Sequence, residues 1–146
     1  MAVPLLRDRV RLPVRVLFVG INPGIRSALL GHHFAGYSNR FWKLLFDAKL
    51  IPQPIGAAED SRLPDWGLGI TNLIARASPG IDALRAEEYA AGLKILRRKV
   101  RRWRPEIVAL VGVTLFRAVY GRSAGARLLF GRLPLHKNRA LVGAAD

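Results

Sequence analysis

Three short apolar segments constrain the fold of this chain more than any other feature. They cover residues 14–19 (VRVLFV), 68–74 (LGITNLI) and 106–112 (EIVALVG), and glycine or asparagine stands at or near the carboxyl end of each. Short runs rich in β-branched residues and bounded by turn residues predict buried strands. Strands that are apolar throughout are typical of a parallel sheet with both faces covered, so we expect an α/β fold.

Helical patterns lie between these strands. Residues 38–50 predict a helix that begins after Ser38 or Asn39, and residues 83–103 predict a longer helix with apolar residues at spacings of three and four. Residues 113–121 predict a third helix, closed by Gly121. Residues 51–67 are rich in proline and glycine and predict a loop with at most one helical turn. The alternation of strands and helices over 146 residues predicts a single domain, residues 1–146.

Composition excludes several classes of protein. The chain has no cysteine, which excludes disulfides, a thiolate nucleophile and cysteine-based zinc sites, and its three histidines are a poor basis for a metal centre. We therefore expect no metal and no cofactor. The N-terminus lacks the pattern of a secretory signal, and no apolar run approaches the roughly 20 residues of a membrane helix. We expect a cytoplasmic protein that makes no contact with membranes and that, in a bacterium, associates with the nucleoid.

The charge balance favours a polyanionic partner. Lysine and arginine total 24 against 10 acidic residues, a formal net charge of +14. A preference for arginine codons would explain arginine in place of lysine, but not the shortage of acids, so we favour contact with nucleic acid. The basic run at residues 97–104 ends the long predicted helix, whose apolar stripe faces the sheet. We expect those charges to form a solvated face.

Candidate site residues follow the predicted strands. Asn22, Asn72 and Gly112 each come just after or at the end of an apolar run. Ligands of parallel α/β sheets bind beyond the carboxyl ends of the strands, so these positions should converge. The loop after the first strand adds aromatic residues, among them Phe34, and an aromatic ring beside amide groups can hold a flat heterocycle. The alternative for Asn22 is a turn residue that only satisfies the backbone.

Three motifs make a family recognisable. In order and spacing, GINPG (20–24), GHHFAGYSNRFWKLLF (31–46) and GITNLIARAS (69–78) resemble the mismatch-specific uracil/thymine-DNA glycosylases of the uracil-DNA glycosylase superfamily, from about Val14 to about Gly121. The resemblance implies a three-layer α/β/α fold and a monofunctional enzyme without metal or cofactor. Such an enzyme flips a uracil, thymine or ethenocytosine paired with guanine out of the duplex and hydrolyses its N-glycosidic bond. The expected partner is duplex DNA with a G:U or G:T mismatch, with single-stranded DNA as a further substrate, and the expected state is a monomer.

The resemblance also implies residue roles. Asn22 corresponds to the catalytic asparagine that orients a water, and backbone N–H groups near Ile21 would stabilise O2 of the departing base. Phe34 corresponds to the aromatic residue that stacks on the base, and Asn72 to the polar residue at the pyrimidine edge. Ser78 corresponds to a hydroxyl residue that holds the water or a phosphate. Further contacts with the nucleotide or its phosphates are expected from Gly20, Gly24, Arg26, His33, Arg40 and Arg76, although His33 reads equally well as a solvated loop histidine.

The last 25 residues depart from the family pattern. The family continues with a fourth strand, a Ser-Gly loop that fills the gap left by the flipped base, and a final helix, and residues 122–146 show none of these convincingly. We therefore expect a shortened or replaced C-terminal part and an uncovered sheet edge beside the third strand. Two alternatives to the mismatch glycosylase remain open. One is a related subfamily that prefers single strands, although Asn22 argues against subfamilies with an acid nearby, and the other is a DNA-binding remnant without turnover.

Overall fold

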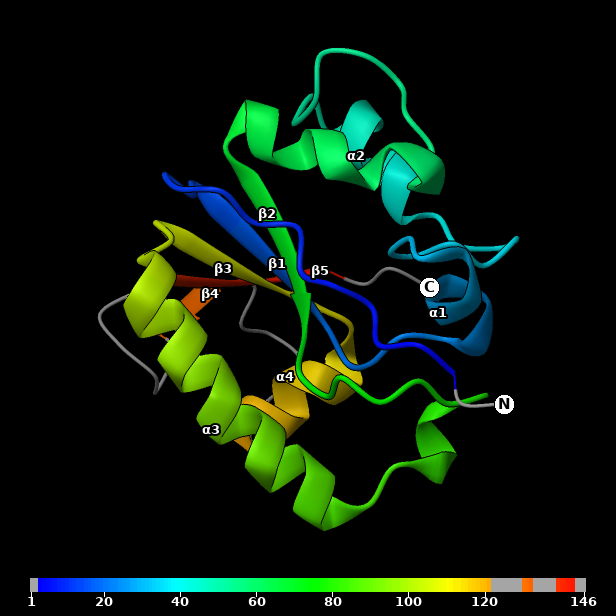
Figure 1. Ribbon diagram of the computed structural model, residues 1–146. Coiled ribbons are helices and arrows are strands. Elements are labelled where there is room, and N and C mark those ends of the chain that lie inside the picture. Colours follow the sequence, from blue (N-terminus) through cyan, green and yellow to red (C-terminus); the bar gives the residue numbers. More distant parts are fainter. Residues whose placement is uncertain (1–2, 122–129, 133–138, 144–146) are drawn as a thin grey trace.

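The computed structural model describes residues 3–121, 130–132 and 139–143. Its centre is a five-stranded sheet in the order β2-β1-β3-β5-β4 (Figure 1). The strands are β1 (Val16–Gly20), β2 (Leu68–Asn72), β3 (Ile107–Val111), β4 (Phe130–Arg132) and β5 (Arg139–Gly143). β1 pairs in parallel with β2 and β3, β5 pairs in parallel with β3, and β4 runs antiparallel to β5.

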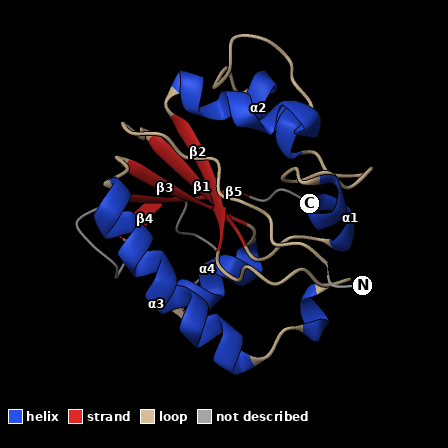
Figure 2. Cartoon of the chain, viewed as in Figure 1, coloured by secondary structure: helices blue, strands red, loops and turns tan. Residues whose placement is uncertain are grey.

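Helices lie on both faces of the sheet (Figure 2), and alternating side chains of the inner strands build one core on each face. Leu17 and Val19 of β1 pack with the helices α3 (Ala86–Trp103) and α4 (Val113–Tyr120). Phe18 of β1 packs on the opposite face with α2 (Phe41–Asp47) and the 3₁₀ helix η1 (Ala57–Trp66). Because side chains alternate along a strand, apolar runs of this kind require cover on both faces, and the expected three-layer α/β/α fold is confirmed.

The elements expected between residues 14 and 121 are present, with shorter ends. Two short helices add to them, α1 (Ile25–Leu30) directly after β1 and η2 (Ile81–Ala83) before α3. The segment 51–67 is more regular than expected, since η1 runs through ten of its residues and buries Asp60 and Leu63. None of the helices in the described ranges is long and apolar enough to cross a membrane.

The expectation of a missing fourth strand is wrong. β5 pairs with β3 from Ile107 opposite Arg139 to Val111 opposite Gly143, so the edge of β3 is covered. The sequence RALVG is too short and too weakly β-branched to predict a strand alone, and its pairing with β3 supplies what the local pattern lacks. The Ser-Gly loop and final helix would follow β5, where residues 144–146 lie outside the described residues.

α3 lies close against the end of β2. Gly92 sits where a Cβ atom would collide with the carbonyl oxygen of Leu73, which explains a glycine in the middle of an 18-residue helix. The basic run 97–104 ends this helix near the start of β3. Arg98, Arg101, Arg102 and Arg104 are exposed, so the expected solvated face is confirmed for four of the six basic residues of the run. Lys99 instead turns inward to Asp8 and Thr71.

Candidate functional site

The backbones that follow β1 and β2 stay paired beyond the strands. Leu73 N–H donates to Gly20 O, Ile74 N–H donates to Ile21 O, and farther on Ser78 N–H donates to Pro23 O, at 2.8, 2.8 and 3.1 Å. The GINPG turn and the segment after β2 therefore form one rigid ledge at the carboxyl edge of the sheet. Outside the sheet, the N–H groups of Ile21 and Asn22 donate to no acceptor in the described residues, which leaves both as donors for a ligand.

Asn22 is fixed across this ledge by both hydrogens of its amide. Nδ2 donates to Arg76 O at 2.9 Å and to Ser78 Oγ at 2.8 Å, and the Ser78 hydroxyl donates onward to Gly80 O at 2.7 Å. Asn22 therefore also stabilises the turn, because its side chain satisfies a backbone carbonyl. The same bonds orient its Oδ1 as an acceptor, and no described residue donates to it. In this arrangement the Ser78 hydroxyl accepts a hydrogen bond from Asn22 and donates its own proton to the backbone carbonyl of Gly80.

Phe34 is held in a strained loop. Its φ of 49° lies in the left-handed region, which costs a non-glycine residue about 1–3 kcal/mol and persists only where neighbouring contacts enforce it. The Trp42 indole N–H supplies one such contact by pointing at the carbonyl oxygens of His33 and Phe34, at 3.1 and 3.2 Å. The Phe34 ring packs on Phe41 with centroids 4.3 Å apart. The strained backbone therefore directs an aromatic ring toward the end of β1.

The absence of a side chain at Gly20 makes room beside that ring. A Cβ atom at Gly20 would lie 2.6 Å from Asn72 Oδ1 and 3.3 Å from Phe34 Cζ. Contacts of this length do not occur between a real Cβ and an amide oxygen, so Phe34 and Asn72 can keep these positions only next to a glycine. The ring and the amide consequently come together next to Gly20 at the carboxyl end of β1.

His33 lies behind Asn72 and is buried, with 2% of its surface exposed. Nε2 is 2.7 Å from Arg7 O, a carbonyl, so this nitrogen carries the proton and donates. Nδ1 is then the acceptor for Asn72 Nδ2 at 3.5 Å, which turns Asn72 Oδ1 toward Gly20. Burial lowers the pKa of His33, chiefly by desolvation of the charged form, and this favours the neutral ring that the arrangement needs. The expectation of a solvated loop histidine is wrong, because the ring is enclosed behind β2.

A fully buried carboxylate, Asp60, supports the histidine loop from η1. It accepts from the His33 backbone N–H at 2.8 Å, and its other oxygen lies 3.1 Å from His32 Nδ1 and 3.2 Å from Arg9 Nε. Sequence analysis missed Asp60 and Arg9. No sequence signal would have found them, because an acid in a proline-rich segment and one arginine among many carry no periodicity.

Several of the residues described above line one hollow of about 290 Å³ at the carboxyl edge of the sheet. Of the expected site residues, it brings together Gly20, Ile21, Asn22, Gly24, Arg26, His33, Phe34 and Asn72. Val111 lines the hollow in place of its neighbour Gly112, while Arg40, Arg76 and Ser78 lie outside the lining set. No aspartate or glutamate is among the lining residues in the described part of the chain. The hollow thus offers an aromatic face, the amide oxygens of Asn22 and Asn72, and backbone donors.

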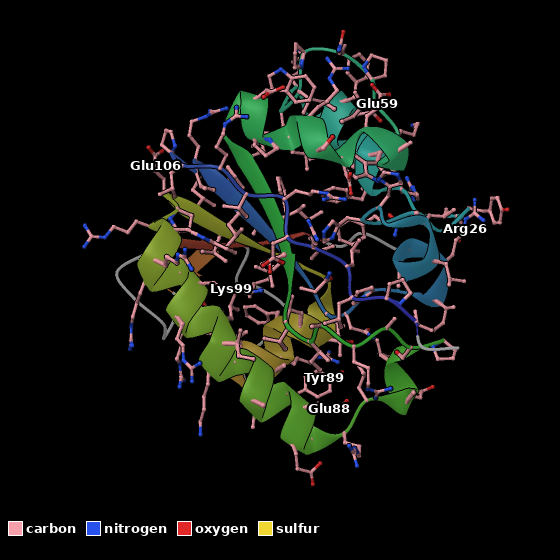
Figure 3. The ribbon with its side chains drawn as sticks, in the orientation of Figure 1. Arg26, Glu59, Glu88, Tyr89, Lys99 and Glu106 are labelled. Carbon is pink, nitrogen blue, oxygen red and sulfur yellow. The ribbon has the colours of Figure 1, made fainter. Side chains whose placement is uncertain are left out.

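The three arginines expected to contact phosphates differ in their availability. Arg76 makes a two-pronged ion pair with Glu88 at 2.9 and 3.0 Å, which raises the pKa of Arg76 and lowers that of Glu88 through their hydrogen bonds. Arg40 is exposed and pairs with no acid in the described residues. Arg26 projects from the side of the molecule far from Glu106 at the start of β3 (Figure 3). Of these three, Arg26 and Arg40 have no acidic partner among the described residues, so their charges remain available to an anion.

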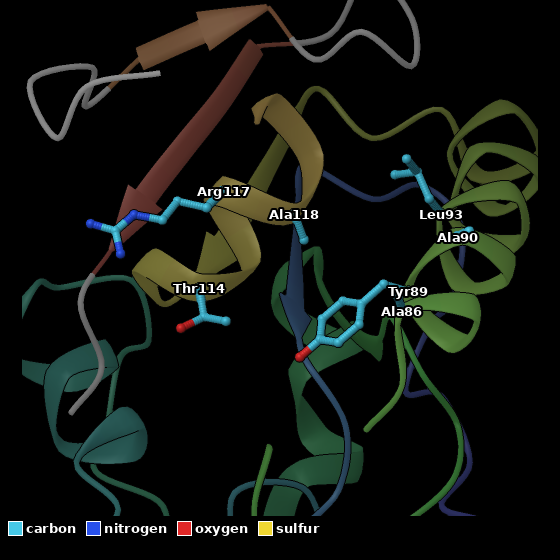
Figure 4. Close-up of a pocket in the computed structure, with 7 residues that line it drawn as sticks. All are labelled: Ala86, Tyr89, Ala90, Leu93, Thr114, Arg117 and Ala118. Carbon is cyan, nitrogen blue, oxygen red and sulfur yellow. The ribbon is translucent and has the colours of Figure 1, made fainter. Parts of the chain in front are cut away.

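A second hollow, of about 880 Å³, separates α3 from α4 (Figure 4). Its lining is mostly alanine and leucine, with Tyr89, Thr114 and Arg117 as the polar members. Burial raises the pKa of the Tyr89 hydroxyl, which keeps it protonated at neutral pH. The hollow has no amide or histidine side chain and lies on the helical face rather than beyond the strand ends. We therefore assign the candidate site to the smaller hollow.

Known proteins resemble this chain over most of its length. A sequence model of the uracil DNA glycosylase superfamily matches residues 8–143. A G/U mismatch-specific uracil DNA glycosylase from Schizosaccharomyces pombe is 45% identical over 118 residues, which cover 77% of this chain. The match covers 35% of that relative, so the chain spans about a third of its length.

Proposed function

The chain belongs to the uracil DNA glycosylase superfamily, and from this premise we propose that it hydrolyses the N-glycosidic bond of uracil opposite guanine in DNA. The observation that carries the proposal is the hollow next to Gly20, which both the Phe34 ring and the Asn72 amide line. A flat ring that stacks on Phe34 would present its edge to an amide oxygen, as a pyrimidine with an N3–H requires.

The target base must leave the duplex to reach this space. A stacked base buries its faces against its neighbours, so we propose that the nucleotide flips into the hollow, at a cost of a few kcal/mol that is smallest for mispaired or single-stranded bases. Stacking on Phe34 would offset part of this cost, at about 1–3 kcal/mol per base. We extend the proposal to thymine and ethenocytosine opposite guanine, and to uracil in single strands.

Bond cleavage would depend on departure of the base. The described lining residues include no carboxylate to act as general base, so a strong nucleophile is not provided. The free N–H groups of Ile21 and Asn22 would stabilise the negative charge that develops on O2 as the C1′–N1 bond breaks. The base leaves with the bonding electrons and then takes up a proton.

Asn22 would position the water that completes the reaction. Its Nδ2 is fixed on Arg76 O and Ser78 Oγ, so its Oδ1 can accept a hydrogen bond from a water without rotating. The water oxygen adds to C1′ of the sugar and loses its proton to solvent. Ser78 contributes by orienting Asn22, and its substitution should affect the same step.

The test is release of uracil from a labelled G:U duplex, detected by alkaline cleavage of the abasic strand. Asn22→Ala should slow release by roughly 10²- to 10⁴-fold, the range for loss of one positioned catalytic group. Affinity for the duplex should change little because phosphate contacts dominate it. Gln53→Ala removes an exposed amide from a loop outside the hollow and serves as the matched control. Equal rates for the two variants would return Asn22 to a structural role, and no release by the unmodified chain would favour a DNA-binding protein without turnover.

A further inference from the structure

Tyr37 is the most exposed of the large hydrophobic side chains described, with 90% of its surface accessible. It directly follows Gly36 in the sequence and contacts Arg26, and both of these residues line the hollow, so the ring lies close to the candidate site. An exposed aromatic ring on a loop ordinarily has many rotamers. This one is held in place.

Arg26 holds the ring. Its guanidinium carbon lies 3.8 Å from the centroid of the Tyr37 ring, while its Nε donates to Ala35 O at 2.9 Å. Ala35 N–H in turn donates to Ser27 Oγ of α1 at 3.0 Å. One face of the tyrosine is therefore covered by a cation that is fixed by the loop, and most of the ring remains open to solvent. Ordering the ring in advance reduces the entropy that a stacking partner must overcome.

The surroundings of this pair select an anionic partner. No acid occurs between Asp8 and Asp47, whereas this stretch contains Arg26 and Arg40. Arg40 is exposed and has no paired acid in the described residues. A base stacked on Tyr37 would have its phosphate within a basic surface, as single-stranded nucleic acid requires.

We propose that Arg26 and Tyr37 form a stacking platform for a nucleobase of the bound DNA, the one next to the nucleotide that enters the hollow. The platform rests on the proposed function, since it needs a flipped nucleotide beside it. Flipping leaves its neighbour without a stacking partner on one side, and an aromatic ring at the mouth can replace the lost stack. The platform would thereby lower the cost of flipping at a position outside the base pocket.

The test uses a duplex in which a stable tetrahydrofuran abasic analogue lies opposite guanine, because this ligand binds without being hydrolysed. Tyr37→Ala should weaken binding by roughly 5- to 150-fold, the range for loss of one base–aromatic stack. Tyr37→Phe should bind within about twofold of the unmodified chain, because stacking needs the ring and not the hydroxyl. 2-Aminopurine placed on either side of the analogue should be quenched at one position, and Tyr37→Ala should restore its fluorescence.

A matched control exists in η1, where Arg62 lies 5.0 Å from the Trp66 ring and neither residue lines the hollow. Arg26→Gln should weaken binding to the abasic duplex, whereas Arg62→Gln should not. Three results would overturn the platform. Tyr37→Ala could bind as tightly as the unmodified chain, Tyr37→Phe could bind as weakly as Tyr37→Ala, or the unmodified chain could fail to bind the abasic duplex. Uracil release is measured separately. If the unmodified chain releases uracil but Tyr37→Ala binds as tightly as the unmodified chain, the platform is excluded and the proposed function stands. If binding depends on Tyr37 but no uracil is released, the platform stands and the proposed hydrolysis is excluded.

Discussion

Gly20→Ala tests the part of the hollow next to Gly20, Phe34 and Asn72, on which the proposed function depends. The added methyl carbon would lie 2.6 Å from Asn72 Oδ1 and 3.3 Å from Phe34 Cζ. The amide would have to turn away, which breaks its contact with His33, and the Phe34 ring would have to shift against Phe41. Overpacking of this kind costs about 1–3 kcal/mol in unfolding free energy.

The effect on catalysis should exceed the effect on stability. A base that can neither stack on Phe34 nor meet the Asn72 amide loses about 1–3 kcal/mol of stacking and about 0.5–1.5 kcal/mol from one hydrogen bond. At 1.4 kcal/mol per factor of ten, kcat/KM for uracil release should fall by roughly 10- to 1000-fold. Binding to undamaged duplex should stay within about twofold, because phosphate contacts dominate that affinity and Gly20 carries no charge.

Gly56→Ala is the matched control, because a Cβ atom at Gly56 meets nothing within 4 Å and the residue does not line the hollow. Single-turnover release from a G:U duplex and urea denaturation should be measured for both variants. The reasoning is refuted if Gly20→Ala releases uracil as fast as Gly56→Ala, since the base would then bind without the space beside Gly20.

Three further predictions concern stability. Asp60→Ala should lower the free energy of unfolding by about 3–5 kcal/mol in urea denaturation, because it leaves Arg9 without its buried partner; a loss below 1 kcal/mol would contradict this. Gly92→Ala should destabilise the fold by about 1–3 kcal/mol through its clash with Leu73, although alanine favours an isolated helix by about 1 kcal/mol, and a stabilised variant would show that α3 can shift. The lowered pKa of His33 means that the unfolded chain binds a proton first, so stability should be complete above pH 6.5 and fall as the pH drops toward the folded pKa; a pH-independent difference between the unmodified chain and His33→Gln would contradict this.

The sequence predicted the part of the site that depends on strand direction. Asn22 and Asn72 follow parallel neighbours, and parallel strands end at the same edge, so their convergence on one hollow is confirmed. Phe34 was expected near the same edge because it lies on the loop that follows the first strand. These inferences need only the order of elements along the chain, which local apolar patterns reveal.

Residues that act across the fold escaped prediction. Glu88 lies on α3 and binds Arg76 from the segment after β2, so an arginine expected to meet phosphate is held by an acid. Whether two charged side chains meet depends on how whole helices and strands pack together. The sequence contains no periodic pattern that would reveal such a contact. β5 escaped for a related reason, because its stability comes from β3 and not from its own five residues.

The His33–Asn72 contact should make base recognition depend on pH. Neutral His33 donates from Nε2 to Arg7 O and accepts from Asn72 Nδ2, which turns Asn72 Oδ1 toward the space beside Gly20. An acceptor there suits uracil, which carries a proton on N3, and opposes cytosine, whose N3 is itself an acceptor. A proton on Nδ1 would face the Nδ2 donor of Asn72, and the amide would gain by rotating its oxygen toward the histidine. Single-turnover uracil release should therefore fall as the pH drops through the lowered pKa of His33, while His33→Gln should lose this step in the profile. If both proteins show the same profile between pH 8 and pH 5, the histidine does not set the orientation of Asn72.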